Sequence, residues 1–449
     1  MTMQPNIANL RDALPDLEWI TSPVHIRRLS RDFFWFSPIL SNQLASKKAD
    51  IVVRPRNEAE LTALVKQCVS ARIPMTVRGG GTGNYGQAVP LEGGVLIDMT
   101  AYSGFEWLAP GLVRVQAGMK IADLEAAVRK QGWELRCMPS TYKTASIAGL
   151  FAGGFGGIGS INYGPISAHG TVQAIRLLTA EPEPQVLELR GEDLLTCHHT
   201  YGTNGIIIDM ELALAPARQW DEYLFDFATL ESAYSFCREM VDACGIEKRE
   251  LSMYDSATAA FFKEIPFSLE AGHTLVMTLV PPHSRQPLTQ LIARHSGTLL
   301  WNQTAEQALT SGLTLMEHCW NHTTLQALKH DKSITNLQAN YDSSRVLEQL
   351  ATLKAELGDE LLMHIEFIRL ANSKLFVTGL PLVRYRNETR LREVMDIHEK
   401  NGVQINDSHV YTLEDGKHNG SLSDAIINSI RARDPFRLLN AGKVRTLDC

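Results

Sequence analysis

The hydrophobic positions from residue 50 onward predict short strands that alternate with amphipathic helices. Residues 50–55 form an apolar run that Pro55 ends, as expected of a short strand, and residues 57–71 carry apolar side chains at helical spacing behind Asn57 as N-cap. Residues 73–77 predict a second strand, and a glycine-rich loop continues it. This order is typical of a βαβ unit whose loop lies at a strand end.

The pattern changes at about residue 217. Before that point, further strands are predicted at residues 95–99, 112–118, 172–179 and 186–189, with a helix at residues 120–131. From about residue 220, strands and amphipathic helices alternate without glycine loops, which favours an antiparallel sheet backed by helices. The 449 residues are too many for one ordinary core, so we expect two domains.

The first glycine loop occupies residues 78–87, where five of ten positions are glycine. Glycine reaches positive φ and has no Cβ, so successive backbone N–H groups can form a nest for an anion such as a diphosphate. The loop differs from G-x-G-x-x-G because a strand follows it, and from a P-loop because no Gly-Lys-Ser/Thr follows. A tight turn between strands is the structural alternative.

A second glycine-dense region follows residue 139. Six glycines lie between residues 149 and 159, too many for a structural helix because each costs about 1 kcal/mol there relative to alanine. We therefore expect a ligand to lie against this backbone. A third segment, residues 200–212, places Gly202 and Gly205 before a run of isoleucines.

The order of these segments resembles the FAD-binding (PCMH-type) domain of the vanillyl-alcohol oxidase and para-cresol methylhydroxylase superfamily of FAD-linked oxidases. The resemblance covers roughly residues 40–217. Residues 433–443 also resemble the superfamily's closing Asp-Pro-x-x-x-x-Asn-Pro-Gly-Lys, with Ala441 in place of proline. The resemblance implies FAD as cofactor, with the diphosphate on the first loop, the ribityl chain and isoalloxazine along the second, and the adenine end near residues 202–207.

The implied cofactor-binding residues lie on these loops and on the closing segment: Arg78, Gly79, Gly80, Gly81, Thr82, Gly83, Asn84, Gln87, Pro139, Ser140, Ser146, Ile147, Gly149, Gly156, Gly157, Ser160, Gly202, Gly205, Ile206, Asn440 and Lys443. Thr82 stands where members with covalently bound flavin often have histidine, so we expect non-covalent FAD. Cys137 lacks the superfamily's paired-attachment context, and attachment by a residue of the second domain stays open.

The resemblance also implies the domain organisation. We expect an α+β protein with a PCMH-type FAD-binding domain at residues 1–217 (core about 40–217), an α+β cap domain at 218–420, and a segment at 421–449 that returns to the first domain. The cap is expected to be an antiparallel sheet covered by helices. In the lactate and glycolate oxidising branch a Glu-His-Gly element helps to hold a divalent metal. The local match here is Glu414-Asp415-Gly416, so we assign no metal ligands.

Composition limits the partners. A net charge of −7 and a pI near 6.1 disfavour nucleic acid and anionic membranes, and favour a small-molecule substrate. The seven cysteines are scattered without a C-x-x-C pair, so neither a disulfide framework nor a zinc site is indicated. No apolar run approaches a membrane span, and we expect a cytoplasmic protein. A homodimer is left open, as is the electron acceptor, oxygen or a redox partner.

Three polar stretches of the second domain supply catalytic candidates: residues 406–418, 363–369 and 317–324. The candidate side chains are His409, Tyr411, His364, Glu366, Arg369 and His322. Strand alternation predicts His364 and Glu366 on one face and Arg369, a potential carboxylate clamp, on the other. For each candidate a hydrogen-bonded structural role is the alternative, and for Arg369 a solvated salt bridge.

These observations predict an FAD-dependent oxidoreductase that oxidises a small alcohol-type substrate by hydride transfer to flavin N5. A neutral histidine would take the hydroxyl proton, a tyrosine would bond the oxygen, and Lys443 or loop N–H groups would offset charge near flavin N1. The substrate is an aromatic or phenolic alcohol or a 2-hydroxy acid, and the altered metal element favours an uncharged one. The alternatives are a flavin-dependent C=C reductase and a flavin-carrying subunit without its own turnover.

Overall fold

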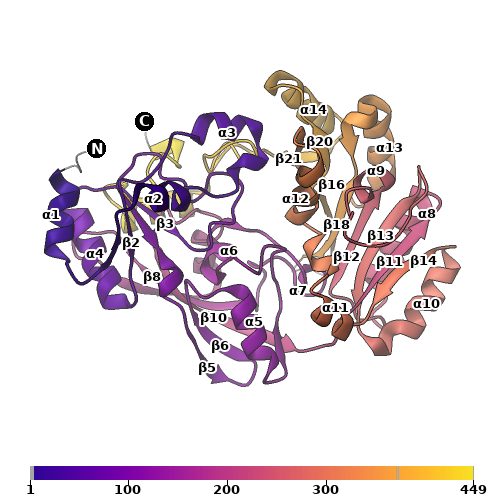
Figure 1. The fold of residues 1–449 in the computed structure, drawn as a ribbon, viewed down its shortest axis with the longest axis horizontal. Coiled ribbons are helices and arrows are strands. Elements are labelled where there is room, and N and C mark those ends of the chain that lie inside the picture. Colours follow the sequence, from indigo (N-terminus) through magenta and orange to yellow (C-terminus); the bar gives the residue numbers. More distant parts are fainter. Residues whose placement is uncertain (1–4, 371, 373, 448–449) are drawn as a thin grey trace.

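The computed structural model describes residues 5–370, 372 and 374–447. Figure 1 shows two lobes side by side. We call residues 5–216 together with 421–447 the first lobe, and residues 221–420 the second lobe. The lobes follow from the sheets described below, and the domain bounds 1–217, 218–420 and 421–449 stay a prediction.

The first lobe contains two sheets. The four-stranded one consists, in spatial order, of β1 (Glu18–Ile20), β2 (Ile51–Arg54), β4 (Val95–Asp98) and β3 (Met75–Arg78). The other consists of β5 (Phe105–Ala109), β6 (Leu112–Gln116), β10 (Ile206–Pro216), β8 (Val172–Leu178) and β9 (Val186–Leu189), with β7 (Trp133–Leu135) paired to β10. The strands β2, β4 and β3 are parallel, as the predicted βαβ start requires.

The helices of the first lobe surround these sheets. They are α1 (Pro5–Ala13), α2 (Pro23–Leu29), α3 (Pro38–Leu44), α4 (Glu58–Ser70), α5 (Ile121–Arg129), α6 (Ile147–Gly153), α7 (Ser160–Tyr163) and α15 (Asp424–Arg433). The predicted N-cap is present, since Asn57 Oδ1 accepts the N–H of Glu60 at 2.9 Å. Short 3₁₀ turns occur in both lobes. Those of the first lobe are Phe34–Phe36, Met99–Ala101, Gly191–Thr196 and Arg445–Leu447, and those of the second lobe are Pro282–Ser284, Leu315–Glu317 and Gly358–Glu360.

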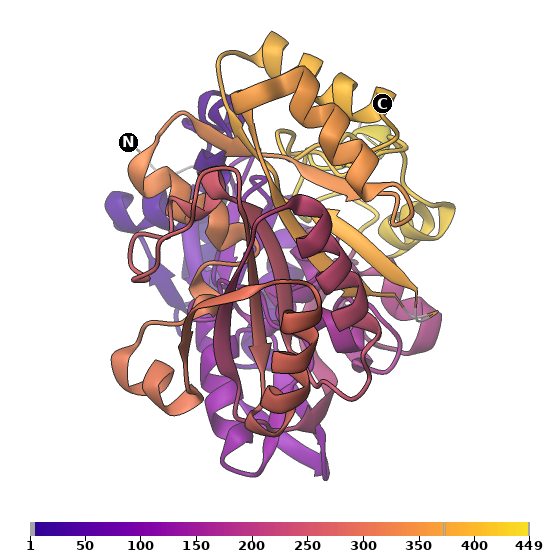
Figure 2. The ribbon, with the colours of Figure 1, turned by 90° about the vertical axis from the view of Figure 1, so that its right-hand side faces the viewer.

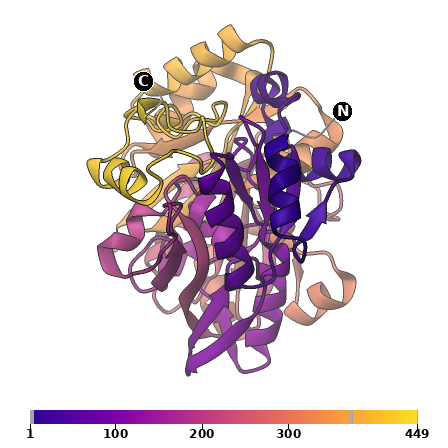
Figure 3. The ribbon, with the colours of Figure 1, turned by 90° about the vertical axis from the view of Figure 1, so that its left-hand side faces the viewer.

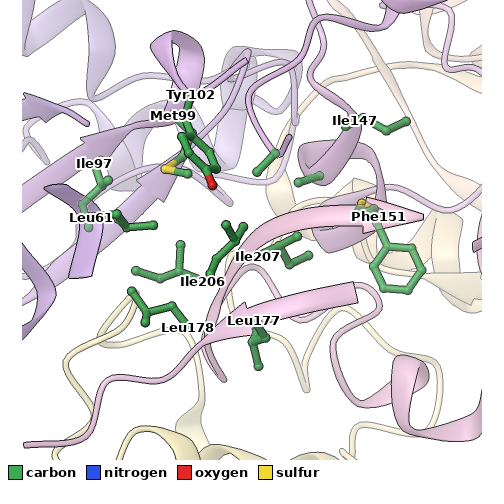
Figure 4. Packing of buried hydrophobic residues seen from close by; sticks show 14 of the residues in the cluster. Leu61, Ile97, Met99, Tyr102, Ile147, Phe151, Leu177, Leu178, Ile206 and Ile207 are labelled. Atoms are coloured by element: carbon green, nitrogen blue, oxygen red, sulfur yellow. The ribbon is translucent and has the colours of Figure 1, made fainter. Parts of the chain in front are cut away.

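A hydrophobic core joins the two sheets of the first lobe. Leu61 from α4 and Ile97 from β4 belong to the same buried cluster as Leu177 from β8 and Ile206 from β10, and Figure 4 shows them at close range. Phe151 from α6 packs on the same core. The helix that carries the second glycine region is therefore anchored to the core, with its other side free to face a ligand.

One expectation about the glycines is wrong. The first part of the 149–159 region is helical, because α6 includes Gly149 and Gly153. Ser146 caps this helix, with its Oγ accepting the N–H of Gly149 at 3.3 Å. A Cβ on Gly153 would lie 3.2 Å from Gln87 Nε2 in the first glycine loop, so the helix approaches that loop closely. Tertiary contact here outweighs the low helix propensity of glycine.

The second lobe is built on one large antiparallel sheet. Its described strands are, in spatial order, β14 (Thr298–Gln303), β11 (Asp221–Phe227), β13 (Thr274–Val280), β12 (Glu250–Asp255), β18 (His364–Arg369), β19 (Leu375–Gly379), β16 (Gln338–Tyr341) and β21 (Gln404–Asn406). A small sheet beside it contains β15 (Ile334–Asn336), β20 (Leu382–Arg384) and β17 (Leu361–Leu362).

Helices cover the outer face of the large sheet, as Figure 2 shows. These are α8 (Leu230–Asp242), α10 (Arg285–Arg294), α13 (Val346–Leu357) and α14 (Glu388–Lys400), whose apolar residues share one cluster with the sheet. The shorter helices α9 (Ser256–Ala259), α11 (Ala305–Ser311) and α12 (Asn321–His330) complete the lobe. The other sheet face looks toward the first lobe, because Ile158 of that lobe packs with Leu224 and Tyr254. This architecture confirms the predicted α+β fold.

The chain ends in the first lobe, where Figure 3 shows the yellow C-terminal segment on the other side of the purple strands from the indigo N-terminal helices. The Met75 N–H donates to Leu438 O at 2.7 Å, and the Asn440 N–H donates to Met75 O at 2.6 Å. Asn440 Nδ2 also reaches Gln87 O at 2.8 Å and Tyr201 O at 2.9 Å. The closing segment thus ties β3 to the loops that follow it. None of the described helices combines the length and apolar character needed to cross a lipid bilayer.

Candidate functional site

A cavity of about 540 Å³ lies between the two lobes. The glycine loops of the first lobe form one wall, and the inner face of the large sheet contributes to the other. The sequence-predicted cofactor residues that line it are Gly79, Gly80, Gly81, Thr82, Gly83, Asn84, Gln87, Pro139, Ser146, Gly149, Gly156, Gly202, Gly205 and Ile206. The fold therefore brings the three predicted glycine segments to one place.

Two of these loops pack against each other without space for a Cβ. A Cβ on Gly79 would lie 1.9 Å from Ser146 Oγ, and one on Gly80 would lie 2.1 Å from Thr144 O. Gly81 adopts a φ of +63°, a left-handed conformation that residues with a side chain rarely adopt. The glycines are thus required by close backbone approach and by conformation, and the bare backbone of both loops is open to a ligand.

Unpaired polar atoms in this wall fit a polar ligand. Asn84 is 4% exposed and its Nδ2 has no hydrogen-bond partner among the described residues. His198 also lines the cavity, and its Nε2 is buried without a hydrogen-bond partner among the described residues. Burial lowers the pKa of His198 to about 4 and that of His199 to about 3, so both rings are neutral at pH 7. A buried, unpaired donor is costly unless a ligand accepts from it.

The remaining predicted cofactor residues lie behind the wall: Arg78, Ser140, Ile147, Gly157, Ser160, Asn440 and Lys443. Ser160 Oγ accepts the N–H of Gly157 at 3.0 Å. Arg78 Nη1 donates to Arg31 O at 2.6 Å, and Ser140 and Ile147 are buried. These contacts hold the loops in shape, and direct contact of these residues with a cofactor stays a prediction.

Two buried groups of opposite charge, Lys443 and Asp32, support the first loop, and Asp32 was missed from the sequence. Lys443 Nζ donates to Gly86 O at 2.6 Å, and burial lowers the pKa of this lysine to about 7, against the opposing charge of Asp32. Burial raises the pKa of Asp32 to about 6, while Lys443 and two backbone N–H groups lower it. Asp32 lines the cavity. It lies in an aromatic N-terminal stretch without a motif, so no sequence signal distinguished it.

The second-lobe wall presents a row of polar side chains. Asn340 lies opposite Thr378 across β16 and β19, and Gln338 lies opposite Asn406 across β16 and β21. All four line the cavity, as does Asp407 after β21. Gln338 Nε2 also donates to Tyr85 OH of the first lobe. The predicted stretches contribute Asn406 and Asp407 from residues 406–418 and Trp320 and Asn321 from residues 317–324, and the rest of the row was not predicted.

Trp320 closes the wall in a strained conformation. Its φ of 53 and ψ of −140 are unusual for a bulky residue. Two buried carboxyl groups hold it, because its N–H donates to Glu366 Oε1 at 2.7 Å and its Nε1 donates to Glu250 Oε2 at 3.1 Å. The indole faces the second glycine region, where a Cβ on Gly156 would lie 3.1 Å from Trp320 Cη2.

His364 and Glu366 lie behind Trp320 and do not line the cavity. They share the inner sheet face as predicted, and His364 Nε2 is 2.7 Å from Glu366 Oε1. Burial raises the pKa of Glu366 to about 7 and lowers that of His364 to about 3. Burial and the neighbouring Glu366 raise the pKa of Glu250. Burial thus disfavours the charged form of each of these groups in a hydrogen-bonded support, and a direct catalytic role for either predicted residue stays untested.

The other catalytic candidates are dispersed. His409 Nδ1 is 2.8 Å from Ser37 Oγ, and Tyr411 lies beside Lys443, whose Nζ is 5.2 Å from its ring centroid. His322 is buried at the start of α12, where burial lowers its pKa to about 4. Arg369 lines a different cavity. Their predicted roles remain untested, and the structure does not bring them together at the main cavity.

Comparison with known protein families identifies the ligand that this geometry suits. Residues 49–187 match the FAD binding domain family. The chain carries an FAD binding domain. The match confirms the predicted resemblance to PCMH-type FAD-linked oxidases and FAD as the cofactor. The fit agrees with the site, because the bare glycine backbone and the unpaired Asn84 amide are suited to a phosphate-containing ligand.

Among curated proteins, the chain is 33% identical over 115 residues to D-lactate dehydrogenase of Archaeoglobus fulgidus, covering 25% of this chain and 26% of that protein. It is 30% identical over 174 residues to glycolate oxidase subunit GlcD of Escherichia coli strain K12, covering 37% and 34%. D-lactate dehydrogenase of Anaerostipes hadrus matches at 30% over 183 residues, covering 38% and 37%. The alignments thus span between 26% and 37% of these relatives.

A solved structure of alkyldihydroxyacetonephosphate synthase has the same fold over nearly the whole chain. The TM-score is 0.74 with 16% sequence identity, covering 98% of this chain and 86% of that one. At this identity the likeness concerns the fold alone.

Proposed function

We propose that the protein is an FAD-dependent oxidoreductase that oxidises a CH–OH group of a small alcohol-type substrate. One observation carries the proposal: a single cavity has the loops of an FAD binding domain on one wall and the polar face of the second-lobe sheet on the other. The names of three relatives, two D-lactate dehydrogenases and a glycolate oxidase subunit, support a 2-hydroxy acid as substrate.

Bound FAD supplies the acceptor for the hydride that leaves the substrate carbon. The chain's own residues orient the substrate and take the hydroxyl proton. Asn340 and Thr378 lie side by side on the cavity wall and are suited to bonding a substrate oxygen. Asp407 is a carboxylate of the same wall, with Oδ1 fixed by the N–H of His409 at 2.7 Å, and we assign proton acceptance to it.

The test is anaerobic reduction of the FAD-loaded protein. Glycolate and D-lactate are added in parallel with aromatic alcohols, and the flavin absorbance is followed. We expect one substrate class to bleach the flavin, and Asp407→Asn to slow bleaching by about 10²-fold or more while flavin binding stays unchanged. This substitution keeps the shape of the side chain, but the amide that replaces the carboxylate cannot take the proton.

Other outcomes would contradict the proposal. A flavin that no alcohol or hydroxy acid reduces would favour a flavin-carrying subunit without turnover. Oxidation of chemically reduced flavin by an activated alkene, but not reduction by any alcohol, would favour a C=C reductase. Asp407→Asn with wild-type bleaching would remove Asp407 from the mechanism and leave the oxidation itself in place.

A further inference from the structure

A second cavity of about 350 Å³ shares no lining residue with the first. It lies where the lobes are joined, between β7, α7, the segment after β10, the loop after α8 and the end of β18. Its volume is within the range of small-ligand sites. Arg369, which the sequence singled out as a carboxylate clamp, belongs to this cavity.

The lining is strongly cationic in a protein whose net charge is −7. Its basic residues are Arg136, Arg218, Lys248, Arg249 and Arg369, and its acidic ones are Glu134 and Glu247. Arg218 Nε pairs with Glu247 Oε2 at 2.8 Å. Arg249 is 3.9 Å from Glu134 Oε1 through its Nε. Shorter ion pairs join Glu134 to Arg129 at 2.5 Å and Arg249 to Glu125 at 3.0 Å, and Arg369 is 4.0 Å from Asp242. Arg136 and Lys248 form no ion pair within 4.0 Å among the described residues, and they give the lining an excess of positive charge.

The cations of this cavity are held close to one another by the protein. Lys248 is 5% exposed and its Nζ donates to Ala243 O at 2.9 Å, after the end of α8. Burial lowers the pKa of Lys248 to about 8, and the charge of Arg369 contributes to this lowering. Arg369 is itself fixed, because Nη2 donates to Val241 O at 2.6 Å and lies 4.0 Å from Asp242 Oδ1. Two like charges thus repel each other across the cavity wall.

Arg249 adds a buried donor whose ion pair with Glu134, at 3.9 Å, is too long for a hydrogen bond. This side chain is 3% exposed, and its Nε has no hydrogen-bond partner among the described residues. Its Nη2 is used, donating to Glu125 Oε1 at 3.0 Å and to Leu135 O at 3.2 Å. A fixed concentration of positive charge with a buried donor that makes no hydrogen bond is suited to an anion ligand.

We propose that this second cavity binds a small dianion, either a phosphate monoester or a dicarboxylate, and that the ligand acts on the main cavity through α7. The link is short. The Gly159 N–H donates to Arg249 O at 2.8 Å, and Asn162 Nδ2 donates to Lys248 O. Phe155 and Gly156, which line the main cavity, directly precede this segment. The dianion is a regulator distinct from the oxidised substrate, so the proposal does not depend on the proposed reaction.

The experiment is calorimetric titration of the FAD-loaded protein with inorganic phosphate and, separately, with succinate, at constant ionic strength set by sodium chloride. We expect saturable binding of at least one of them. Arg136→Gln and Arg369→Gln are each expected to weaken binding by about tenfold, since each removes a charge-assisted contact. The matched control is Arg392→Gln, because Arg392 pairs with Glu388 on α14, away from this cavity.

Flavin absorbance during the same titration tests the link through α7, and we expect a spectral shift that saturates with the calorimetric curve. Saturation by phosphate alone or by succinate alone would support the site and select the ligand class. Heats that do not saturate, or equal affinity in Arg136→Gln, Arg369→Gln and the control, would overturn it. Each variant's melting temperature and flavin content are measured first. If one of the two cavity variants does not fold, the other still decides the question.

Discussion

A single methyl group at Gly80 tests whether the packed glycine loops form the FAD site. The backbone at Gly80 is not left-handed, so alanine adds bulk without backbone strain. The new Cβ would lie 2.1 Å from Thr144 O and 2.9 Å from Ala145 Cα, and both are backbone atoms that cannot turn away. Gly80→Ala therefore forces the first loop away from the second.

The size of the effect follows from these contacts. A C···O contact is normally about 3.3 Å, so the loops must separate by about 1 Å. Overpacking of this kind costs about 1–3 kcal/mol. The flavin-free protein can relieve the clash by separating the loops, so FAD binding must bring them back together at this cost, which corresponds to about 5- to 150-fold weaker FAD binding.

The assay is fluorescence titration of flavin-free protein with FAD. Gly245→Ala is the matched control, because a Cβ there meets nothing within 4 Å and the position also lacks a left-handed φ. Gly149→Ala gives an intermediate case, since its new Cβ meets Ser146 Oγ at 2.9 Å, a side-chain atom that can rotate. The expected order of FAD affinity is Gly245→Ala, then Gly149→Ala, then Gly80→Ala.

Wild-type FAD affinity in Gly80→Ala would refute the reasoning, provided that its melting temperature in the absence of flavin shows a folded protein. It would mean that FAD does not require the observed approach of the two loops. Equal weakening in all three variants would also refute it, because Gly245 lies far from any contact that the methyl group could disturb.

Three further predictions concern the support behind Trp320 and the pH dependence of stability. Trp320→Phe removes the donor to Glu250, so we expect a loss of about 1–3 kcal/mol in urea unfolding; an unchanged midpoint would mean that the hydrogen bond contributes nothing. Glu250→Gln keeps an acceptor oxygen, so it should lower the unfolding free energy in urea by less than Glu250→Leu does. Because burial raises the pKa of Glu366 to about 7, the folded protein keeps a proton there that the unfolded chain releases at lower pH. Glu366 should therefore contribute a decline in the unfolding free energy as pH rises from 5 toward 7, by up to about 3 kcal/mol, against the opposite trend of the buried histidines, whose pKa values are lowered. The unfolding free energy of the wild type relative to Glu366→Gln should fall by this amount over the same pH range. An equal slope in that variant would assign the pH dependence to other groups.

The FAD-facing wall was predictable because its signal is local. A backbone that closely approaches a ligand or another backbone often needs glycine at the contact. The glycines at residues 79–83 and 149–157 are therefore recognisable as a contact signal in the sequence. The order of these segments relative to strands then indicated the domain. The error at α6 has the same origin, since propensity excluded a helix that Ser146 capping and the hydrophobic anchor of Phe151 stabilise.

The second-lobe wall was not predictable because its residues belong to separate strands and share no local pattern. Asn340 and Thr378 are 38 positions apart and become neighbours only through the pairing of β16 with β19. A carboxamide on alternate strand positions is also what an exposed strand would show. The histidines were predicted as catalytic candidates because imidazole can accept a proton. His364 and His409 are instead buried, and they form hydrogen bonds with Glu366 and Ser37.

The strain at Trp320 indicates what the buried carboxyl pair is for. A tryptophan with φ of 53 persists only when its surroundings fix it, and here Glu366 holds the backbone while Glu250 holds the ring. Burying two carboxyl groups is unfavourable, so a fold that needed only packing would use apolar residues at these positions. The pair instead fixes one aromatic ring against Gly156, at the point where the lobes meet over the cavity. Glu366 contacts Trp320 directly and His364 contacts Glu366, so both residues lie behind Trp320, and a role of either one in the reaction stays a prediction.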